Sequence, residues 1–307
     1  MSWLRKVGRL FGFGEGRVRE WESVPYELRE GVGLAVHDSP ALLELEERLR
    51  KAVQGAGWLE HVKMRVFAKH PRMTDAEYDW LWLELRRFFL MTTVVRYVPM
   101  YSPKVDDIWH EMLLFSREYE AFCRSFAGRV IHHTPHVNAV PRQQAARDRA
   151  WFELLYGTMF SVQPNSERVL GRFRLRPIPA DDLDWLRMSG TEEIYERLMA
   201  EPSGDAAVDR AAKDIAERIY EHGRRLDDYK MHGRKAVSSN VNDYAAAYAV
   251  SLLTFSVLQE EQRVHAGGDS GVVPYADSGD SGGGGGGGDG GGSSCGGSSC
   301  GGGCGGS

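Results

Sequence analysis

The sequence has no apolar run long enough to cross a lipid bilayer. Its most apolar stretch, residues 245–258, is shorter than the roughly 20 residues that a membrane-spanning helix needs, and Asp243 and Glu260 lie close to its ends. At the N-terminus, basic and apolar residues are interleaved, without the continuous apolar segment of a secretory signal. We therefore expect a cytoplasmic protein with no transmembrane segment, in which residues 245–258 form a buried core helix.

Cysteine is scarce, with four residues in a chain of 307. Thiols stay reduced in the cytoplasm, so we expect no disulfide framework. Cys295, Cys300 and Cys304 lie near the C-terminus, and their spacing is a poor match to the paired C-x2-C elements of zinc modules. The simplest interpretation is that these thiols are incidental, with metal binding, oxidative cross-linking and lipid attachment as alternatives.

The motifs of several enzyme classes are also missing. No glycine-rich loop carries the Lys-Ser/Thr pair of a P-loop, and no Gly-x-Ser-x-Gly nucleophile elbow occurs. His110-Glu111 lacks the second histidine of a His-Glu-x-x-His zinc site. Adjacent carboxylates such as Asp106 and Asp107 point about 100° apart on a helix, so they do not form an acid–base pair by themselves. The sequence therefore identifies no reaction.

Most of the remaining chain shows apolar residues at helical spacing. Ser39 precedes a helix predicted over 41–54. Thr74 and Glu77 form a capping box before an apolar helix from 78 to about 91. The same spacing predicts helices over 104–126, 142–160, 191–201, 206–227 and 242–264. The fold class predicted is all-α, mainly an orthogonal helical bundle.

The predicted layout has three parts: an amphipathic N-terminal helix (1–14), a helical body (20–265) and a C-terminal tail (266–307). A subdomain break in the body would fall at 201–205, and one short extended segment is expected near 168–176, where apolar and basic residues alternate. The tail is rich in glycine, serine and cysteine. It has too little apolar surface to offset the entropy cost of ordering, so it is predicted to be disordered.

The N-terminal residues have the pattern of a basic amphipathic helix. Its apolar face consists of Trp3, Leu4, Val7, Leu10 and Phe11. Such a helix can lie in a membrane interface or dock in a partner's groove, and packing on the protein's own body is the alternative. We therefore expect contact with a protein partner or a membrane surface, which would make the protein peripheral at a membrane.

A second basic segment lies in the middle of the chain. It contains Arg168, Arg172, Arg174 and Arg176, with Phe173 among them. A basic ribbon with an aromatic residue can bind RNA or another anion, although an exposed segment paired with nearby acids is the more ordinary interpretation. The net charge of −5 makes nucleic acid an unlikely partner, because phosphate contact favours a basic surface.

Histidines cluster in one region of the chain, where four of the ten lie at His110, His132, His133 and His136. His110 follows Asp106 by one helical turn. The Asp106 carboxylate could therefore accept a hydrogen bond from the His110 ring and fix its orientation, as supporting residues do for metal-binding histidines. A chain reversal at Gly128 would bring the later histidines back toward the helix. The simplest interpretation is that these are hydrogen-bonded structural histidines. A site for zinc or a similar divalent metal and acid–base catalysis are the alternatives.

This region resembles bacterial relatives of the glycine-rich domain-containing protein family over residues 99–136. The shared pattern is Asp-x-x-Trp-His at 106–110, Tyr-x-x-Phe-Cys at 119–123 and Gly…His-His-x-Pro at 128–135. Plant members often have a second histidine where Met112 stands here, so that ligand is missing. The resemblance implies a helical domain with interaction or regulatory roles, and it implies no particular activity.

Two functions are therefore expected. The first is a non-enzymatic helical interaction or scaffold protein whose N-terminal helix and tail contact partners. The alternative is a metal-binding protein or metalloenzyme that uses His110, His132 and His133. The metal function requires these side chains to converge with ligand atoms about 2.0–2.1 Å from one ion.

Overall fold

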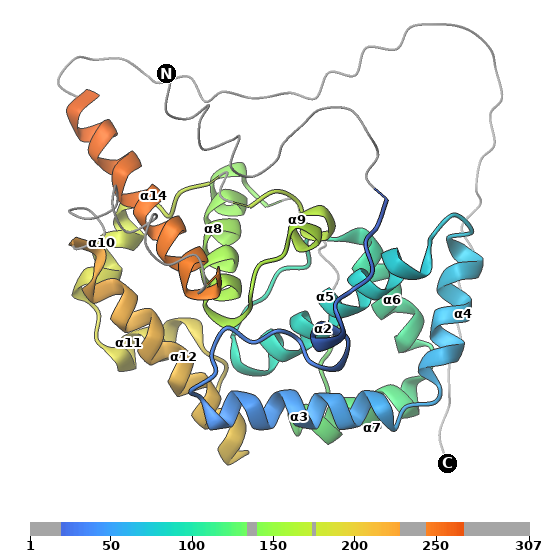
Figure 1. Cartoon of the computed structure of the whole chain (residues 1–307). Coiled ribbons are helices and arrows are strands. Elements are labelled where there is room, and N and C mark those ends of the chain that lie inside the picture. The colour runs from blue at the N-terminus through green and yellow to red at the C-terminus, as the bar shows by residue number, and fades with distance from the viewer. Residues whose placement is uncertain (1–19, 134–139, 174–175, 228–243, 267–307) are drawn as a thin grey trace, which may run out of the picture. The chain divides into compact units, whose positions relative to one another are not determined.

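The computed structural model describes residues 20–133, 140–173, 176–227 and 244–266 (Figure 1). These residues form helices and loops, and none of them belongs to a strand beyond two isolated bridges, Leu34 with Phe160 and Val95 with Met199. The predicted all-α fold is confirmed. Among the described helices none is long and apolar enough to span a membrane. The helix predicted over 1–14 and the tail from 267 onward lie outside the described residues.

Most of the described residues belong to helices. In chain order they are α2 (Tyr26–Glu30), α3 (Pro40–Gln54), α4 (Leu59–Lys69), α5 (Asp75–Val94), α6 (Pro103–Leu113), α7 (Ser116–Ala127), α8 (Arg142–Met159), α9 (Pro164–Leu170), α10 (Ala180–Met188), α11 (Thr191–Leu198), α12 (Ala206–Arg224) and α14 (Tyr244–Ala266).

Helix α5 lies at the centre of the core and packs against α2, α3, α6, α9 and α12. Thr74 caps it, because its hydroxyl accepts a hydrogen bond from the Glu77 amide at 3.1 Å. The other half of the predicted capping box does not form, since the Glu77 carboxylate binds Lys104 of α6. Leu83 and Phe89 are fully buried, and each such side chain contributes about 1.5–3 kcal/mol to stability.

The single helix predicted over 104–126 is wrong at its middle. The chain leaves the helical conformation at Phe115 (φ −100°, ψ 60°), which separates α6 from α7. The Phe115 ring packs against Trp58, with centroids 5.7 Å apart, and stacks on His61. Because of the break, α6 packs on α4 and α5 while α7 packs on α3. One straight helix could not follow both surfaces.

The extended segment predicted near 168–176 is also wrong in its first part, because Arg168 belongs to helix α9. Pro164 occupies the first turn of α9, where a proline costs no hydrogen bond. Val169 and Leu170 are buried on one side of the helix. Gly171 (φ 85°) then ends it. The described residues that follow are neither helix nor strand.

Helix α14 contains the whole apolar stretch 245–258, and it packs beside α8 (Figure 1). Ala249, Leu252 and Leu253 are fully buried, which confirms a core helix. The two helices approach closely at Gly157, because a Cβ atom there would lie 2.3 Å from the Tyr248 ring. Any larger residue at 157 would push the helices apart.

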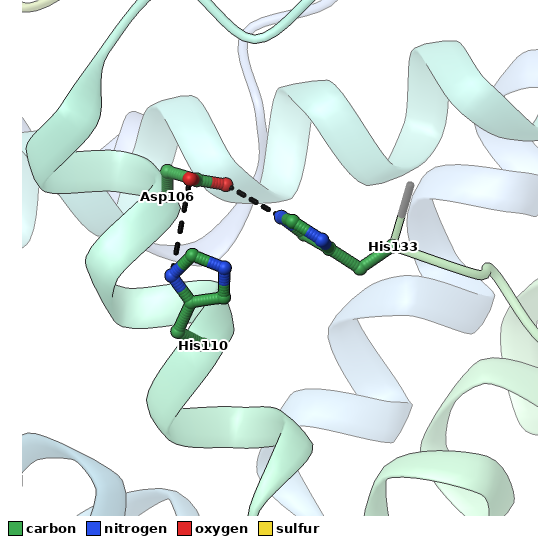
Figure 2. A group of neighbouring side chains, drawn as sticks. All are labelled: Asp106, His110 and His133. Carbon is green, nitrogen blue, oxygen red and sulfur yellow. Dashed lines mark hydrogen bonds and ion pairs between the residues drawn. The ribbon is translucent and has the colours of Figure 1, made fainter. Parts of the chain in front are cut away.

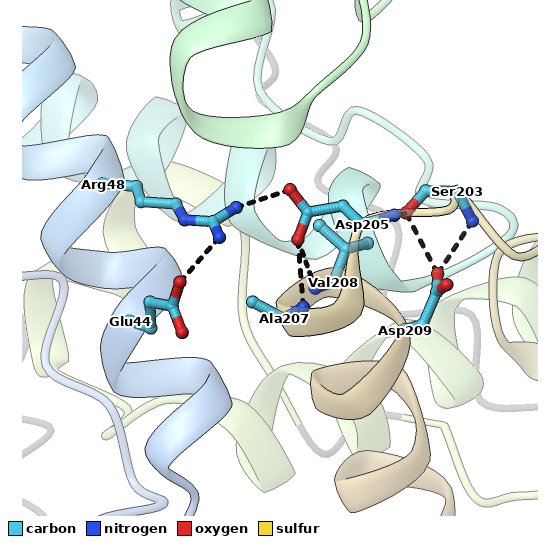
Figure 3. Close-up of polar contacts among 7 residues, drawn as sticks. All are labelled: Glu44, Arg48, Ser203, Asp205, Ala207, Val208 and Asp209. Carbon is cyan, nitrogen blue, oxygen red and sulfur yellow. Dashed lines mark hydrogen bonds and ion pairs between the residues drawn. The ribbon is translucent and has the colours of Figure 1, made fainter.

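The loop before α12 is held to α3 by one carboxylate, as Figure 3 shows. Asp205 caps α12 by accepting from the amides of Ala207 and Val208, at 3.0 and 3.3 Å. Its other oxygen accepts from Arg48 of α3 at 2.7 Å, and Arg48 also pairs with Glu44. The residues on both sides of 201–205 therefore belong to one packed unit, in which α12 contacts α3, α5, α8, α10 and α11.

Candidate metal centre

Helix α6 has three faces that meet different surroundings. Ser102 caps its first turn by accepting from the Val105 amide, and Pro103 follows as the first helical residue, a position that suits proline. The buried face consists of Val105, Ile108, Trp109 and Met112. Asp107 and Glu111 face α4, and Asp106 and His110 lie on the remaining flank.

On that flank, Asp106 and His110 of α6 meet His133 from the segment after α7 (Figure 2). His133 Nε2 lies 2.9 Å from Asp106 Oδ1, and His110 Nδ1 lies 3.8 Å from Asp106 Oδ2. The two imidazole rings have centroids 4.5 Å apart. The His133 side chain is 14 % exposed and that of His110 is 46 % exposed, so the group opens toward solvent on the His110 side.

The three side chains each offer one ligand atom, and all of these atoms lie within 4.8 Å of one another. Ligand atoms around a tetrahedral zinc ion are about 3.3 Å from each other, given metal–ligand distances of about 2.0–2.2 Å. The ligand atoms would therefore have to move closer by up to about 1.5 Å to bind such an ion. Two histidines and one carboxylate are ligands that zinc and similar divalent transition metals accept, so the donor set of Asp106, His110 and His133 fits such an ion.

The chain reversal predicted at Gly128 is present and brings His133 to α6. Gly128 ends α7 in the left-handed conformation (φ 69°), which glycine adopts without strain. The ring of His133 then meets the ring of Trp109 edge-on, with centroids 4.5 Å apart. The cluster therefore combines Asp106 and His110, which are one turn apart on α6, with His133, which reaches them because the chain reverses at Gly128.

Of the other predicted ligands, His132 is not part of this group. His132 is exposed, and among the described residues the group contains Asp106, His110 and His133. His136 lies in 134–139, outside the described residues. Asp106 is predicted to support His110 from behind. In the structure each of its carboxylate oxygens lies near one of the two histidines, so Asp106 could also serve as a third ligand.

The neighbouring carboxylate, Asp107, has partners that the sequence analysis missed. It accepts from Lys69 Nζ at 2.7 Å and lies 3.0 Å from His70 Nε2, both at the end of α4. Burial alone would raise the pKa of Asp107, but the hydrogen bonds and charges of Lys69 and His70 outweigh it and hold that pKa below its ordinary value. This is a salt bridge that joins α4 to α6.

On the α4 side the surface also has an open depression of about 490 Å³. It is lined by His61, Met64, Arg65, Ala68 and Phe115. Met64 is 59 % exposed, and Arg65 pairs with Glu111 at 2.7 Å. The lining contains none of the three residues of the cluster, so the depression and the cluster are separate features.

The described residues of the predicted basic ribbon have different surroundings. The Arg168 guanidinium stacks over the Trp21 ring at 3.7 Å, and Arg172 is exposed. Phe173 is buried against Tyr156 and Tyr248, so it cannot stack on a base. Arg174 lies outside the described residues, and Arg176 is partly buried.

Residues 48–174 match the family model described as UCP032817-like. The matched range contains all three residues of the cluster, and its description names no activity. No curated protein and no solved structure matches the chain.

Proposed function

We propose that this protein binds one divalent transition metal of the zinc type through Asp106, His110 and His133. The observation that carries the proposal is the convergence of three potential ligand atoms, within 4.8 Å, from α6 and from the segment after α7. The pattern that the chain shares with bacterial glycine-rich domain-containing proteins contains all three residues, and we propose that the chain is related to that family.

The charges around the cluster also support a metal. Asp106 pairs with two histidines, whereas the cation that pairs with Asp107 is Lys69. A neutral imidazole offers a lone pair and no positive charge. A divalent ion between Asp106 and the two rings would supply that charge and use both lone pairs. Three protein ligands are typical of zinc sites that keep a position for water or substrate, so a metalloenzyme is one form of this proposal.

The test begins with a form of the protein whose tail thiols cannot bind metal. In this form, called the serine-tail protein, the full chain carries serine in place of Cys295, Cys300 and Cys304. It is loaded with zinc, dialysed and measured by elemental analysis, and its affinity is determined by competition with a coloured chelator. We expect about one equivalent of bound zinc, as for a mononuclear site.

Four variants of the serine-tail protein locate the ion. His110→Ala and His133→Ala should lose the bound zinc. His132→Ala, which removes the neighbouring exposed histidine, and His70→Ala, which removes the histidine on Asp107, should keep it. If the serine-tail protein binds no zinc, or if all four variants bind it equally, the proposal is wrong.

A second proposal of another class is that the protein is a helical interaction protein in the cytoplasm, peripheral at a membrane. The apolar face of the predicted helix 1–14 supports it, as does the apolar depression on the α4 side. Leu10→Glu should abolish binding to anionic lipid vesicles in a sedimentation assay. Ser2→Glu adds the same charge on the polar face and should reduce binding less. Equal binding by wild type and Leu10→Glu contradicts the proposal.

A further inference from the structure

We propose that Tyr119 is a positioning residue for the metal site, because its hydroxyl fixes the backbone that carries His133. Trp109 Nε1 donates a hydrogen bond to the Tyr119 hydroxyl at 2.8 Å. The same hydroxyl donates to the carbonyl oxygen of Ile131 at 2.6 Å. The expected effect of Tyr119 on metal affinity rests on the proposed function, whereas its effect on the position of the His133 ring does not.

The three groups of this chain of hydrogen bonds are all buried. Trp109, Tyr119 and Ile131 are each 4–5 % exposed. Burial raises the pKa of Tyr119, so the hydroxyl keeps its proton and can donate it to the carbonyl. Without that hydroxyl, a buried indole N–H and a buried carbonyl would each lose a partner, and an unpaired buried polar group is costly.

The hydrogen bonds join three separate parts of the chain that must meet at the site. Trp109 comes from α6, Tyr119 from α7, and Ile131 from the segment after Gly128. Ile131 precedes His133 by two residues, and each residue extends the chain by at most about 3.6 Å. Holding the Ile131 carbonyl therefore restricts where the His133 ring can lie.

Trp109 contributes to this restriction twice. Its indole N–H holds the Tyr119 hydroxyl, and its ring lies against the His133 ring with centroids 4.5 Å apart. His133 then reaches Asp106 Oδ1 at 2.9 Å. The position of this ligand is thus set by buried groups beneath the site, which is how residues behind a metal ligand raise affinity.

A matched control separates positioning from general stability. Tyr156 is also buried, and its hydroxyl donates to Glu84 at 2.7 Å and accepts from Arg87 at 2.5 Å. These residues belong to α8 and α5 and take no part in the cluster. Tyr156→Phe therefore removes a buried, doubly bonded hydroxyl as Tyr119→Phe does, but leaves the His133 segment untouched.

The experiment uses the serine-tail protein with two readouts. The first is zinc affinity by chelator competition, which should fall about 10–100-fold in Tyr119→Phe, the usual effect of a residue behind a ligand, and should be unchanged in Tyr156→Phe. The second is an NMR cross-relaxation signal between the Trp109 indole and the His133 ring in the metal-free protein. It should be present in the parent protein and in Tyr156→Phe, and absent or weakened in Tyr119→Phe.

The outcomes are distinct. Loss of both the signal and the affinity in Tyr119→Phe supports the proposal, and an unchanged signal overturns it, whatever the affinity. A lost signal with unchanged affinity also overturns it. If the parent protein binds no zinc, the proposed function fails, and the NMR signal alone decides whether Tyr119 positions His133.

Should Tyr119→Phe not fold, Trp109→Phe removes the indole donor instead. Shifted His133 ring resonances together with lower zinc affinity would then support the proposal, while unchanged resonances and affinity would overturn it.

Discussion

Asp106 and Asp107 are consecutive residues of α6, and each carboxylate lies about 3 Å from a histidine nitrogen, but their surroundings differ. Asp107 meets His70 at 3.0 Å together with Lys69 at 2.7 Å, and both partners come from α4. Asp106 meets His133 at 2.9 Å together with His110 at 3.8 Å. Asp107 therefore faces the end of a neighbouring helix, whereas Asp106 faces the next residue on its own helix face and the segment that follows the turn at Gly128.

The difference shows how the same side chain can serve structure or ligand binding. Lys69 is a permanent cation, so the Asp107 pair is neutralised within the protein and needs no further partner. Asp106 meets two imidazoles, which act either as donors or as ligands, depending on their protonation. Two histidines beside a carboxylate can release protons from their ring nitrogens when a metal ion binds, whereas a lysine ammonium has no lone pair to offer a metal.

The largest expected difference between the two carboxylates is in zinc affinity. Asp106→Asn in the serine-tail protein should weaken zinc binding by more than about 100-fold, since even residues behind a ligand cost about 10–100-fold. Asp107→Asn removes a similar charge one residue away and should leave the affinity nearly unchanged. Chelator competition measures both. Equal losses in the two variants would mean that only the local negative charge matters, and that Asp106 is not a ligand.

The next effect is the stabilisation of the fold by bound metal. At a zinc concentration of 100 times the dissociation constant, the free energy of unfolding should rise by about 2.7 kcal/mol. This increase should disappear in His133→Ala and persist in His70→Ala, because only the former removes a proposed ligand. Urea unfolding with and without zinc measures it. An increase that survives in His133→Ala would place the ion elsewhere.

Much of the fold follows from local sequence signals, and helix α4, which the sequence analysis missed, lacks them. Ser39 and Thr74 cap α3 and α5 as their positions predict. Helix α4 has no side-chain cap and buries only Val62 and Val66, so its apolar pattern is weak. Its contact with α6 holds it in place, and that contact is not visible in the sequence. With α4 missed, Lys69 and His70 could not be assigned to Asp107.

The break between α6 and α7 was missed for the opposite reason. Apolar residues continue at helical spacing from Val105 to Phe126, so the pattern shows no end at Phe115. In the site, the one-turn spacing of Asp106 and His110 was readable from the sequence. The choice of His133 over His132 was not, because it depends on how the chain leaves Gly128 and on the contact of Tyr119 with the Ile131 carbonyl.

The smallest expected effect concerns the acid stability that Asp107 contributes. At pH 7 Asp107→Asn should lower the free energy of unfolding by about 1 kcal/mol, the size of a partly exposed ion pair. Lys69 and His70 hold the pKa of Asp107 below its ordinary value in the folded protein, against about 3.9 in the unfolded chain. The stabilisation is therefore fully present above pH 4 or so and is lost as the pH falls through the lowered folded value. Urea unfolding of wild type and Asp107→Asn from pH 7 to about pH 3 measures the difference between their free energies of unfolding, which should close only below about pH 4.

Lys69→Met removes the cation from the same pair, and its difference from wild type should close over the same pH range. A difference that stays constant to the lowest pH would mean that Asp107 stabilises the fold without its charge.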